Sequence, residues 1–474
     1  MTKRRIRNVG AGLAAVLVGA SLFSASDVAL AQGGGLELVS ATFTSEFPRG
    51  FRIQAEVRGP SELEIIAVRI RIGQQTAGTY DYLDFKAGNL INGNLFWRTN
   101  TLGRYIPPGT IITYSFEIKD VDGNILKTEP DQFIYYDPAF EWTEITKGPI
   151  TVAYHGPVET RAHIVLDAMI ETLGTMGPLL GADTDTPIRV TMYNNRLEMV
   201  RAQPPRSAAI ARTTTTLGQA FSEEGMLLVM GSRDARGTAS HEVTHILVHR
   251  AADSPGHNVP AWLNEGLAEY GNIEEGAEFD IALEFAVATG GLQSTLKMIA
   301  PPGNPEDLII FYGQSRSIVR FMIERFGAEK MTELMAVMKR GIKAEDAIER
   351  VYGMSQLDLE NMWRDDIGAP LYFVSDEGQA RPTAIPRRRI GLYSLTPQPD
   401  TETVAAASDT PTAPPERTVS QPSDTPMPAP LAEEGERSGR GSGCSAALQG
   451  GPLDVTAAAL LLGLVGLRFR PRRD

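Results

Sequence analysis

The sequence has one cysteine, Cys444, among its 474 residues. No intramolecular disulfide can form, so stability must come from burial and from any metal that the chain binds. The chain also lacks an excess of basic residues: 45 lysines and arginines face 58 aspartates and glutamates, for a formal charge of −13. Because phosphate binding is driven by basic side chains, nucleic acid is not an expected partner. No internal repeat is visible.

The first 31 residues have the pattern of a secretory signal. Four basic residues, Lys3, Arg4, Arg5 and Arg7, precede the apolar run AGLAAVLVGASLF, and an Ala-Leu-Ala motif ends at Ala31. A basic start, a short apolar run and a small-residue cleavage motif are the three parts of such signals. We therefore expect the mature protein to be exported.

The C-terminal end, residues 444–474, has three parts in order: Cys444, an apolar stretch from Val455 to Leu467, and four arginines within the last seven residues. The stretch is shorter than the roughly 20 residues of a spanning helix. The tail resembles the C-terminal sorting signals of bacterial surface proteins that carry a cysteine. That resemblance implies cleavage near Cys444 by a membrane-embedded sorting protease and a lipid on the cysteine. The alternative is a single-pass anchor held by its arginines. Either way, we expect the protein at the outer face of a membrane.

Between these ends the pattern changes twice. Short alternating strands such as FRIQAEV, in which Phe51, Ile53, Ala55 and Val57 share one face, predict an immunoglobulin-like or fibronectin-like β-sandwich. Strands followed by long helical runs then predict an α+β domain, and a segment rich in Pro, Thr and Ser predicts a disordered linker. The predicted organisation is signal 1–31, sandwich 32–138, α+β domain 139–376, linker 377–443 and sorting signal or hydrophobic segment 444–474.

The stretch GTASHEVTHILVHR contains His241, Glu242 and His245 in the order H-E-x-x-H. On a helix, residues four apart are separated by about 40° around the axis, so the two imidazoles project from one face. Ala239, Val243, Ile246 and Leu247 would form the opposite, buried stripe of that helix. By itself the pattern is a moderate signal for zinc, because a catalytic zinc needs three protein ligands and an open position.

The run PAWLNEGLAEYGN supplies candidates for the remaining ligand. Glu265 lies 20 residues after His245 on a second predicted helix that begins near Pro260. Glu269, one turn further, would project in the same direction and could bond the second nitrogen of a ligating histidine. A solvated helix face is the alternative explanation for each carboxylate.

HEVTH followed by PAWLNEGLAEY resembles the gluzincin metallopeptidases, and more closely the bacterial peptidase MA-like domains. The resemblance covers about residues 140–368. It implies one zinc ion per chain held by His241, His245 and Glu265, with Glu242 as catalytic base and Glu269 supporting the site. It further implies that GMLLVMG, residues 225–231, is the sheet-edge strand on which an extended peptide substrate pairs. The metzincin pattern is excluded, because Val248 and Ala251 replace its Gly and third His.

Three other residues are weaker candidates. Tyr312 precedes a long predicted helix at a position where related domains carry a tyrosine, and it could stabilise an oxyanion; packing in the core is an equal alternative. We expect His249 at the rim of the site and His257 at the surface. The predicted function is a zinc-dependent peptidase acting on peptides or proteins. The alternative is a cell-surface binding or adhesion protein that uses the sandwich and keeps a peptidase-like scaffold.

Overall fold

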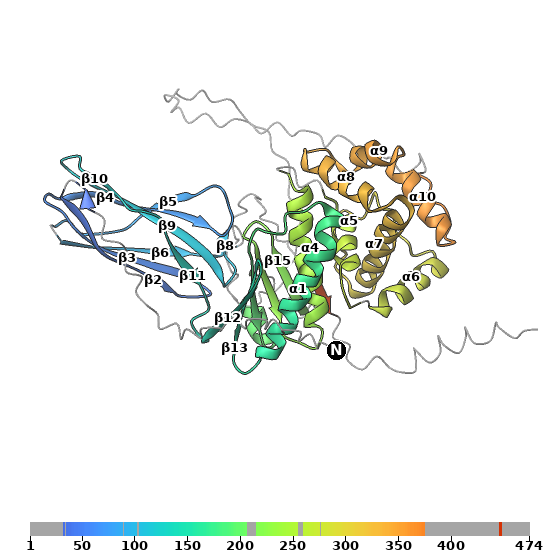
Figure 1. Cartoon of the computed structure of the whole chain (residues 1–474), viewed down its shortest axis with the longest axis horizontal. Helices are drawn as coiled ribbons and strands as arrows, with labels where there is room; N and C mark the ends of the chain where they lie inside the picture. Colours follow the sequence, from blue (N-terminus) through green and yellow to red (C-terminus); the bar gives the residue numbers. More distant parts are fainter. Residues whose placement is uncertain are drawn as a thin grey trace, which may run out of the picture. The chain divides into compact units, whose positions relative to one another are not determined.

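The computed structural model describes residues 32–33, 35–88, 90–101, 104–205, 215–254, 259–274, 276–374 and 445–447 (Figure 1). The predicted signal, the linker, and residues 444 and 448–474 of the tail lie outside these ranges. Contacts divide the chain into one unit of residues 1–372 with 438–474 and a second of residues 373–437. All of the helices and strands in the described ranges belong to the first unit. None of the helices in the described ranges is long and apolar enough to cross a membrane.

The N-terminal part consists of β-strands in two main sheets. One sheet has the order β1-β2-β3-β6, and the other has the order β10-β9-β4-β5 with β11 also paired to β9. A short hairpin of β7 and β8 follows β6. The strand bounds are β1 Gln32–Gly33, β2 Leu36–Ser45, β3 Gly50–Arg58, β4 Leu63–Ile72, β5 Thr79–Tyr82, β6 Leu90–Arg98, β7 Asn100–Thr101, β8 Arg104–Tyr105, β9 Thr110–Asp120, β10 Ile125–Lys127 and β11 Asp131–Tyr135.

The two sheets share one core, as the alternating sequence pattern predicts. Phe51, Ile53, Ala55 and Val57 of β3 are all buried, which confirms the predicted face. Ring contacts join the sheets: Phe43 of β2 stacks on Tyr114 of β9 with centroids 3.8 Å apart. A β-rich N-terminal region is thus present, and its immunoglobulin-like or fibronectin-like topology stays a prediction.

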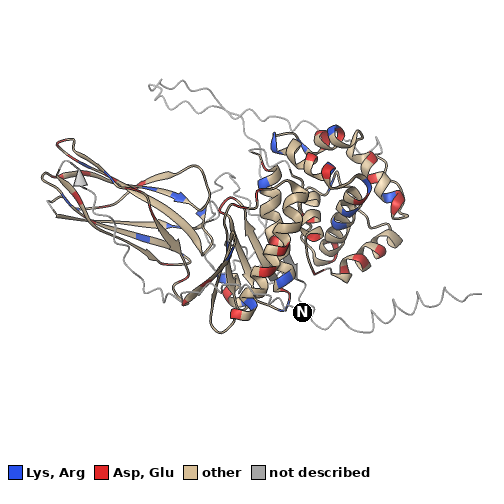
Figure 2. Ribbon diagram, viewed as in Figure 1, with Lys and Arg blue, Asp and Glu red and all other residues tan. Residues whose placement is uncertain are grey.

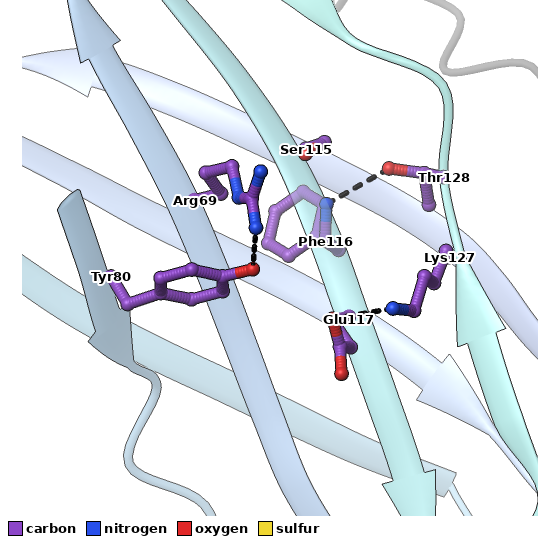
Figure 3. A pocket seen from close by; sticks show the side chains of 7 residues that line it. All are labelled: Arg69, Tyr80, Ser115, Phe116, Glu117, Lys127 and Thr128. Carbon is purple, nitrogen blue, oxygen red and sulfur yellow. Dashed lines mark hydrogen bonds and ion pairs between the residues drawn. The ribbon is translucent and has the colours of Figure 1, made fainter. Parts of the chain in front are cut away.

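A shallow polar depression lies on the second sheet (Figure 3). The guanidinium of Arg69 lies 4.6 Å from the Tyr80 ring centroid and also bonds the Tyr80 hydroxyl. Lys127 pairs with Glu117 at 3.1 Å. The side chains of Arg69 and Tyr80 in this depression thus pair with each other, as do those of Lys127 and Glu117. In the described part of the sandwich, no group of His, Cys, Asp or Glu side chains could hold a metal ion.

The second part contains a mixed sheet of order β12-β13-β14-β16-β15-β17. The three strands β13, β14 and β16 run parallel, whereas β12, β15 and β17 pair antiparallel with their neighbours. The bounds are β12 Trp142–Lys147, β13 Ile150–His155, β14 Ile188–Tyr193, β15 Thr215–Phe221, β16 Met226–Met230 and β17 Ser445–Ala447.

Helices cover one face of this sheet and continue into a helical half (Figure 1). The bounds are α1 Glu159–Leu180, α2 Arg196–Arg201, α4 Ala235–Ala252, α5 Ala261–Tyr270, α6 Ala277–Thr289, α7 Pro305–Phe326, α8 Ala328–Lys339, α9 Ala344–Tyr352 and α10 Gln356–Asp366. Acidic and basic residues both occur along these helices (Figure 2). The predicted order of a β-rich region followed by a domain of strands and helices is therefore confirmed.

One prediction about the sheet is wrong. Met226–Met230, within GMLLVMG, is not the edge strand: β16 lies between β14 and β15. All five of its residues are buried, because successive side chains enter two different cores. Leu227 and Val229 pack with α1 and α4, while Leu228 joins the core that includes sandwich residues. A short run that is apolar at every position fits a central strand, covered on both faces. β15 pairs with β16 on the side away from β14, and the sequence did not predict this strand.

Candidate metal centre

The H-E-x-x-H stretch lies on α4, an 18-residue helix. Its last turn carries His249 and Arg250, and the positive charge of Arg250 suits the C-terminal end of a helix. The predicted apolar stripe of Ala239, Val243 and Ile246 is buried. However, the opposite side is buried too, which a simple amphipathic helix does not predict. The reason is tertiary: α4 packs against α1, α5, α8 and β15, so its polar face is enclosed by protein.

The two histidines of α4 project toward each other. Their ring centroids are 4.8 Å apart, and Nε2 of His241 lies 3.1 Å from Nε2 of His245. Both side chains are almost completely buried. The i, i+4 spacing therefore places both imidazoles on one side of the helix, as predicted.

The carboxylate of Glu265 approaches the same point from α5. Its Oε2 atom lies 3.5 Å from Nε2 of His241 and 3.5 Å from Nε2 of His245. Helix α5 starts after Pro260, as predicted. It is held close to α7 at Gly266, where a Cβ atom would lie 2.4 Å from the carbonyl oxygen of Ser315. Glycine at 266 thus permits the helix packing that positions the neighbouring Glu265.

The outer nitrogens of the two rings also have partners on α5. Nδ1 of His241 lies 3.0 Å from Oε1 of Glu269, although the angle departs from that of a regular hydrogen bond. Nδ1 of His245 lies 3.0 Å from Oδ1 of Asn264. A proton on each Nδ1 leaves both Nε2 lone pairs directed at the point where Glu265 arrives. Glu269 lies beside His241 as predicted, but without the regular hydrogen bond that was expected. Asn264 was missed; its position next to Glu265 in LNEG was the available signal.

Charge and burial act against each other in this cluster. Burial lowers the pKa of His241, but Glu269 and the contact with Glu265 outweigh it and raise that pKa well above its usual value. Burial similarly lowers the pKa of His245, and the charge of Glu265 reverses the effect and raises it. Burial raises the pKa of Glu265, yet the neighbouring His245 and His241 bring it down to about 2. Glu265 is therefore an anion, and the pocket favours positive charge between these groups.

The three side chains fit a metal ion. In tetrahedral zinc sites with ligand distances near 2.1 Å, ligand atoms lie about 3.4 Å from one another. Here the three separations are 3.1, 3.5 and 3.5 Å. Oε2 of Glu265 is buried and receives no regular hydrogen bond from a described residue. No other group of His, Cys, Asp or Glu side chains in the described ranges converges in this way. Two imidazoles and one carboxylate are ligands that zinc accepts, with a fourth position left for a small molecule.

Glu242 lies beside this cluster and is completely buried. It is enclosed by β15, where Gly218 provides the space: a Cβ atom at residue 218 would lie 2.5 Å from Cγ of Glu242 and 2.8 Å from its Oε1. The carboxyl group of Glu242 therefore lies between helix α4 and strand β15. Sequence reasoning identified Glu242 but not the strand that covers it.

The weaker candidates have different positions. The Tyr312 ring on α7 lies 6.3 Å from the His241 ring and also contacts Phe279 and Phe311, so it is buried next to the cluster. His249 is partly exposed and pairs with Asp253 at 3.2 Å, one turn away from the converging nitrogens. His257 lies outside the described residues. The structure thus brings Tyr312 to the site and leaves His249 at its periphery.

The family comparison concerns the same part of the chain, whereas the likenesses to solved structures extend over more of it. Residues 168–369 match the model of the Peptidase MA superfamily. The chain is similar to the M1 zinc metallopeptidase from Deinococcus radiodurans, at 12% identity, over 73% of this chain and 96% of that one, with a TM-score of 0.31. A mutant of that enzyme bound to a Tyr-Ser-Ala substrate gives 12% identity, the same coverage and a TM-score of 0.30. At these TM-scores the two likenesses carry no argument about activity.

The curated proteins contain no match to this chain. The family match, by contrast, spans α4 and α5 together with the helices that follow, and so includes His241, His245 and Glu265. The region of this chain that builds the His-His-Glu cluster is therefore the region that matches the Peptidase MA superfamily.

Proposed function

We propose that the protein is an exported, surface-anchored zinc peptidase that hydrolyses peptide bonds. The observation that carries this proposal is the convergence of His241, His245 and Glu265, with ligand atoms 3.1 to 3.5 Å apart. Export and anchoring are supported by the sequence patterns of residues 1–31 and 444–474. Peptides or proteins are the proposed substrates, since the matching domain belongs to a peptidase superfamily.

Each residue of the cluster has a proposed task. His241, His245 and Glu265 hold one zinc ion, while Glu269 and Asn264 fix the orientation of the two rings. When bound, zinc supplies Lewis-acid chemistry, polarising a peptide carbonyl and making water more acidic. Glu242 takes a proton from the attacking water and passes it to the leaving amine. Tyr312 donates a hydrogen bond to the oxyanion that develops on the former carbonyl oxygen.

The experiment that tests this proposal measures zinc content and peptide hydrolysis in the same preparations. Replacement of Glu242 by Gln keeps the size of the side chain and removes the base. We expect the Glu242→Gln protein to retain one zinc ion per chain and to lose hydrolysis by at least about 100-fold. Full activity in Glu242→Gln would refute the assigned base.

A binding or adhesion role without catalysis is the competing function. Intact Glu242, buried beside the cluster, argues against it, because a scaffold has no need of a base. A quenched-peptide library, assayed with and without a chelator, separates the two functions. Absence of chelator-sensitive cleavage in a zinc-loaded protein would favour the binding role.

A further inference from the structure

The outer edge of β15 is paired with a segment from the distant C-terminal region. β16 occupies one side of β15, and Ser445–Ala447 forms β17 on the other side, antiparallel to it. The paired residues are Thr215 with Ala447, Thr216 with Ala446, and Gly218 with Ser445. β17 also lies beside α4. A strand edge that would otherwise present unpaired backbone groups is thereby covered by the chain itself.

This edge borders the candidate site. Gly218 is the residue of β15 whose α-carbon faces Glu242, and it is also the partner of Ser445. The backbone of the C-terminal segment therefore runs past the position of the proposed catalytic base. An extended peptide added to β15 in this direction would be recognised through its backbone.

We propose that Ser445–Ala447 binds in cis to a peptide-docking edge on β15 and competes there with peptides supplied in trans. The docking surface is the outer edge of β15 from Thr215 to Gly218, and its occupant is an extended, antiparallel segment. That trans peptides are also substrates rests on the proposed function, whereas the pairing itself does not. Because the occupant belongs to the same chain, its effective concentration does not depend on the concentration of protein, and it weakens trans binding without any change in the site.

Processing of the tail would free the outer edge of β15. If the sorting protease cuts immediately after Cys444, the cysteine stays on the chain to carry the lipid, and β17 is removed with the rest of the tail. The docking edge then becomes available to other peptides only after the chain has been processed.

The test uses the full chain with adjacent prolines, Ala446→Pro/Ala447→Pro. Successive N–H groups of a strand point to opposite edges, so one of two adjacent prolines removes an N–H aimed at β15. The matched control, Ala446→Ser/Ala447→Ser, keeps both N–H groups. All three chains carry Glu242→Gln, so that turnover does not consume the probe. The probe is a fluorescent peptide with the sequence Ser-Ala-Ala-Leu-Gln of residues 445–449.

Two measurements are made on these chains. Hydrogen exchange of the amides from Thr215 to Gly218 should quicken by about 10-fold or more in the proline variant and stay unchanged in the serine control. The peptide should bind the proline variant about 10-fold or more tightly than the other two chains. Equal exchange in all three chains, or equal peptide affinity, would overturn the proposal. Because both readouts are independent of hydrolysis, failure of the proposed peptidase activity is detected separately, by the assay of the Glu242-intact chain.

Discussion

Gly218 of β15 lies directly against Glu242 of α4, with no space for even one methyl group between them. A Cβ atom at residue 218 would come within 2.5 Å of Cγ of Glu242, a separation that requires the carboxylate to move. We therefore expect Gly218→Ala to displace the proposed base while leaving the His-His-Glu cluster in place. Hydrolysis should fall by about 100-fold, because general-base catalysis requires hydrogen-bond reach, and zinc content should stay at one per chain.

The matched control for this prediction is Gly174→Ala. Residue 174 lies within α1, and a Cβ atom there would meet nothing within 4 Å. Alanine is also the better helix former, by about 1 kcal/mol. Activity should therefore be unchanged in the control. An equal loss in both variants, or no loss in Gly218→Ala, would contradict the prediction.

Removal of one imidazole should abolish the stabilisation that zinc provides. In the unaltered protein, zinc at about 1,000 times its dissociation constant should add about 4 kcal/mol to the free energy of unfolding. We expect no such increase in His245→Ala, because two ligands do not hold the ion. Thermal unfolding with and without zinc measures the difference. His163→Ala is the control, since His163 is exposed on α1 and should keep the whole zinc effect; a zinc-dependent rise in His245→Ala would exclude this residue as a ligand.

The contact between Asn264 and His245 should contribute to metal affinity. Oδ1 of Asn264 lies 3.0 Å from Nδ1 of His245 and orients the ring. Loss of such an outer partner typically weakens metal binding by 10- to 100-fold. We expect this loss in Asn264→Ala and a smaller one in Asn264→Asp, which retains an acceptor oxygen. Competition with a chromophoric chelator gives both affinities; identical values for Asn264→Ala and the parent protein would disprove the role.

Glu224 should make stability depend on pH. It lies in the turn between β15 and β16, where it accepts a hydrogen bond from Gln75 of the sandwich at 3.0 Å. Burial, with a smaller contribution from Glu223, raises the pKa of Glu224 to about 7 from an ordinary 4.5. Because the folded state holds this proton more tightly, the free energy of unfolding decreases as pH rises from about 4.5 to 7, and the loss is complete above pH 7.

Replacement of Glu224 by Gln should remove this decrease in the free energy of unfolding at higher pH. Above pH 7 the variant should be more stable than the parent by about 1–3 kcal/mol, and near pH 4.5 the two should differ little. Urea denaturation at pH 5 and pH 8 measures this. Glu62→Gln, at an exposed position of the sandwich, is the control. A difference between variant and parent that is the same at both pH values would show that the carboxyl group does not titrate in this range.

Much of the site could be read from the sequence because its parts are local. Helical spacing alone puts His241 and His245 on one side of α4, and the second motif puts Glu265 and Glu269 one turn apart on α5. The strands of the N-terminal region followed from alternation, as in β3. These features depend on residues fewer than ten positions apart, where backbone geometry fixes the direction of each side chain.

What the sequence did not reveal depends on contacts between distant segments. The strand β15, the burial of both sides of α4, and the pairing of Asn264 with His245 each require elements that meet only in the folded chain. The order of strands in the sheet also depends on contacts between distant segments. It shows that Met226–Met230 is not the edge strand. Periodicity determines which face of an element is apolar, but not which neighbour covers it. The sequence by itself thus determined the converging side chains of the site, and only tertiary packing decided what encloses them and which strand edge lies beside Glu242.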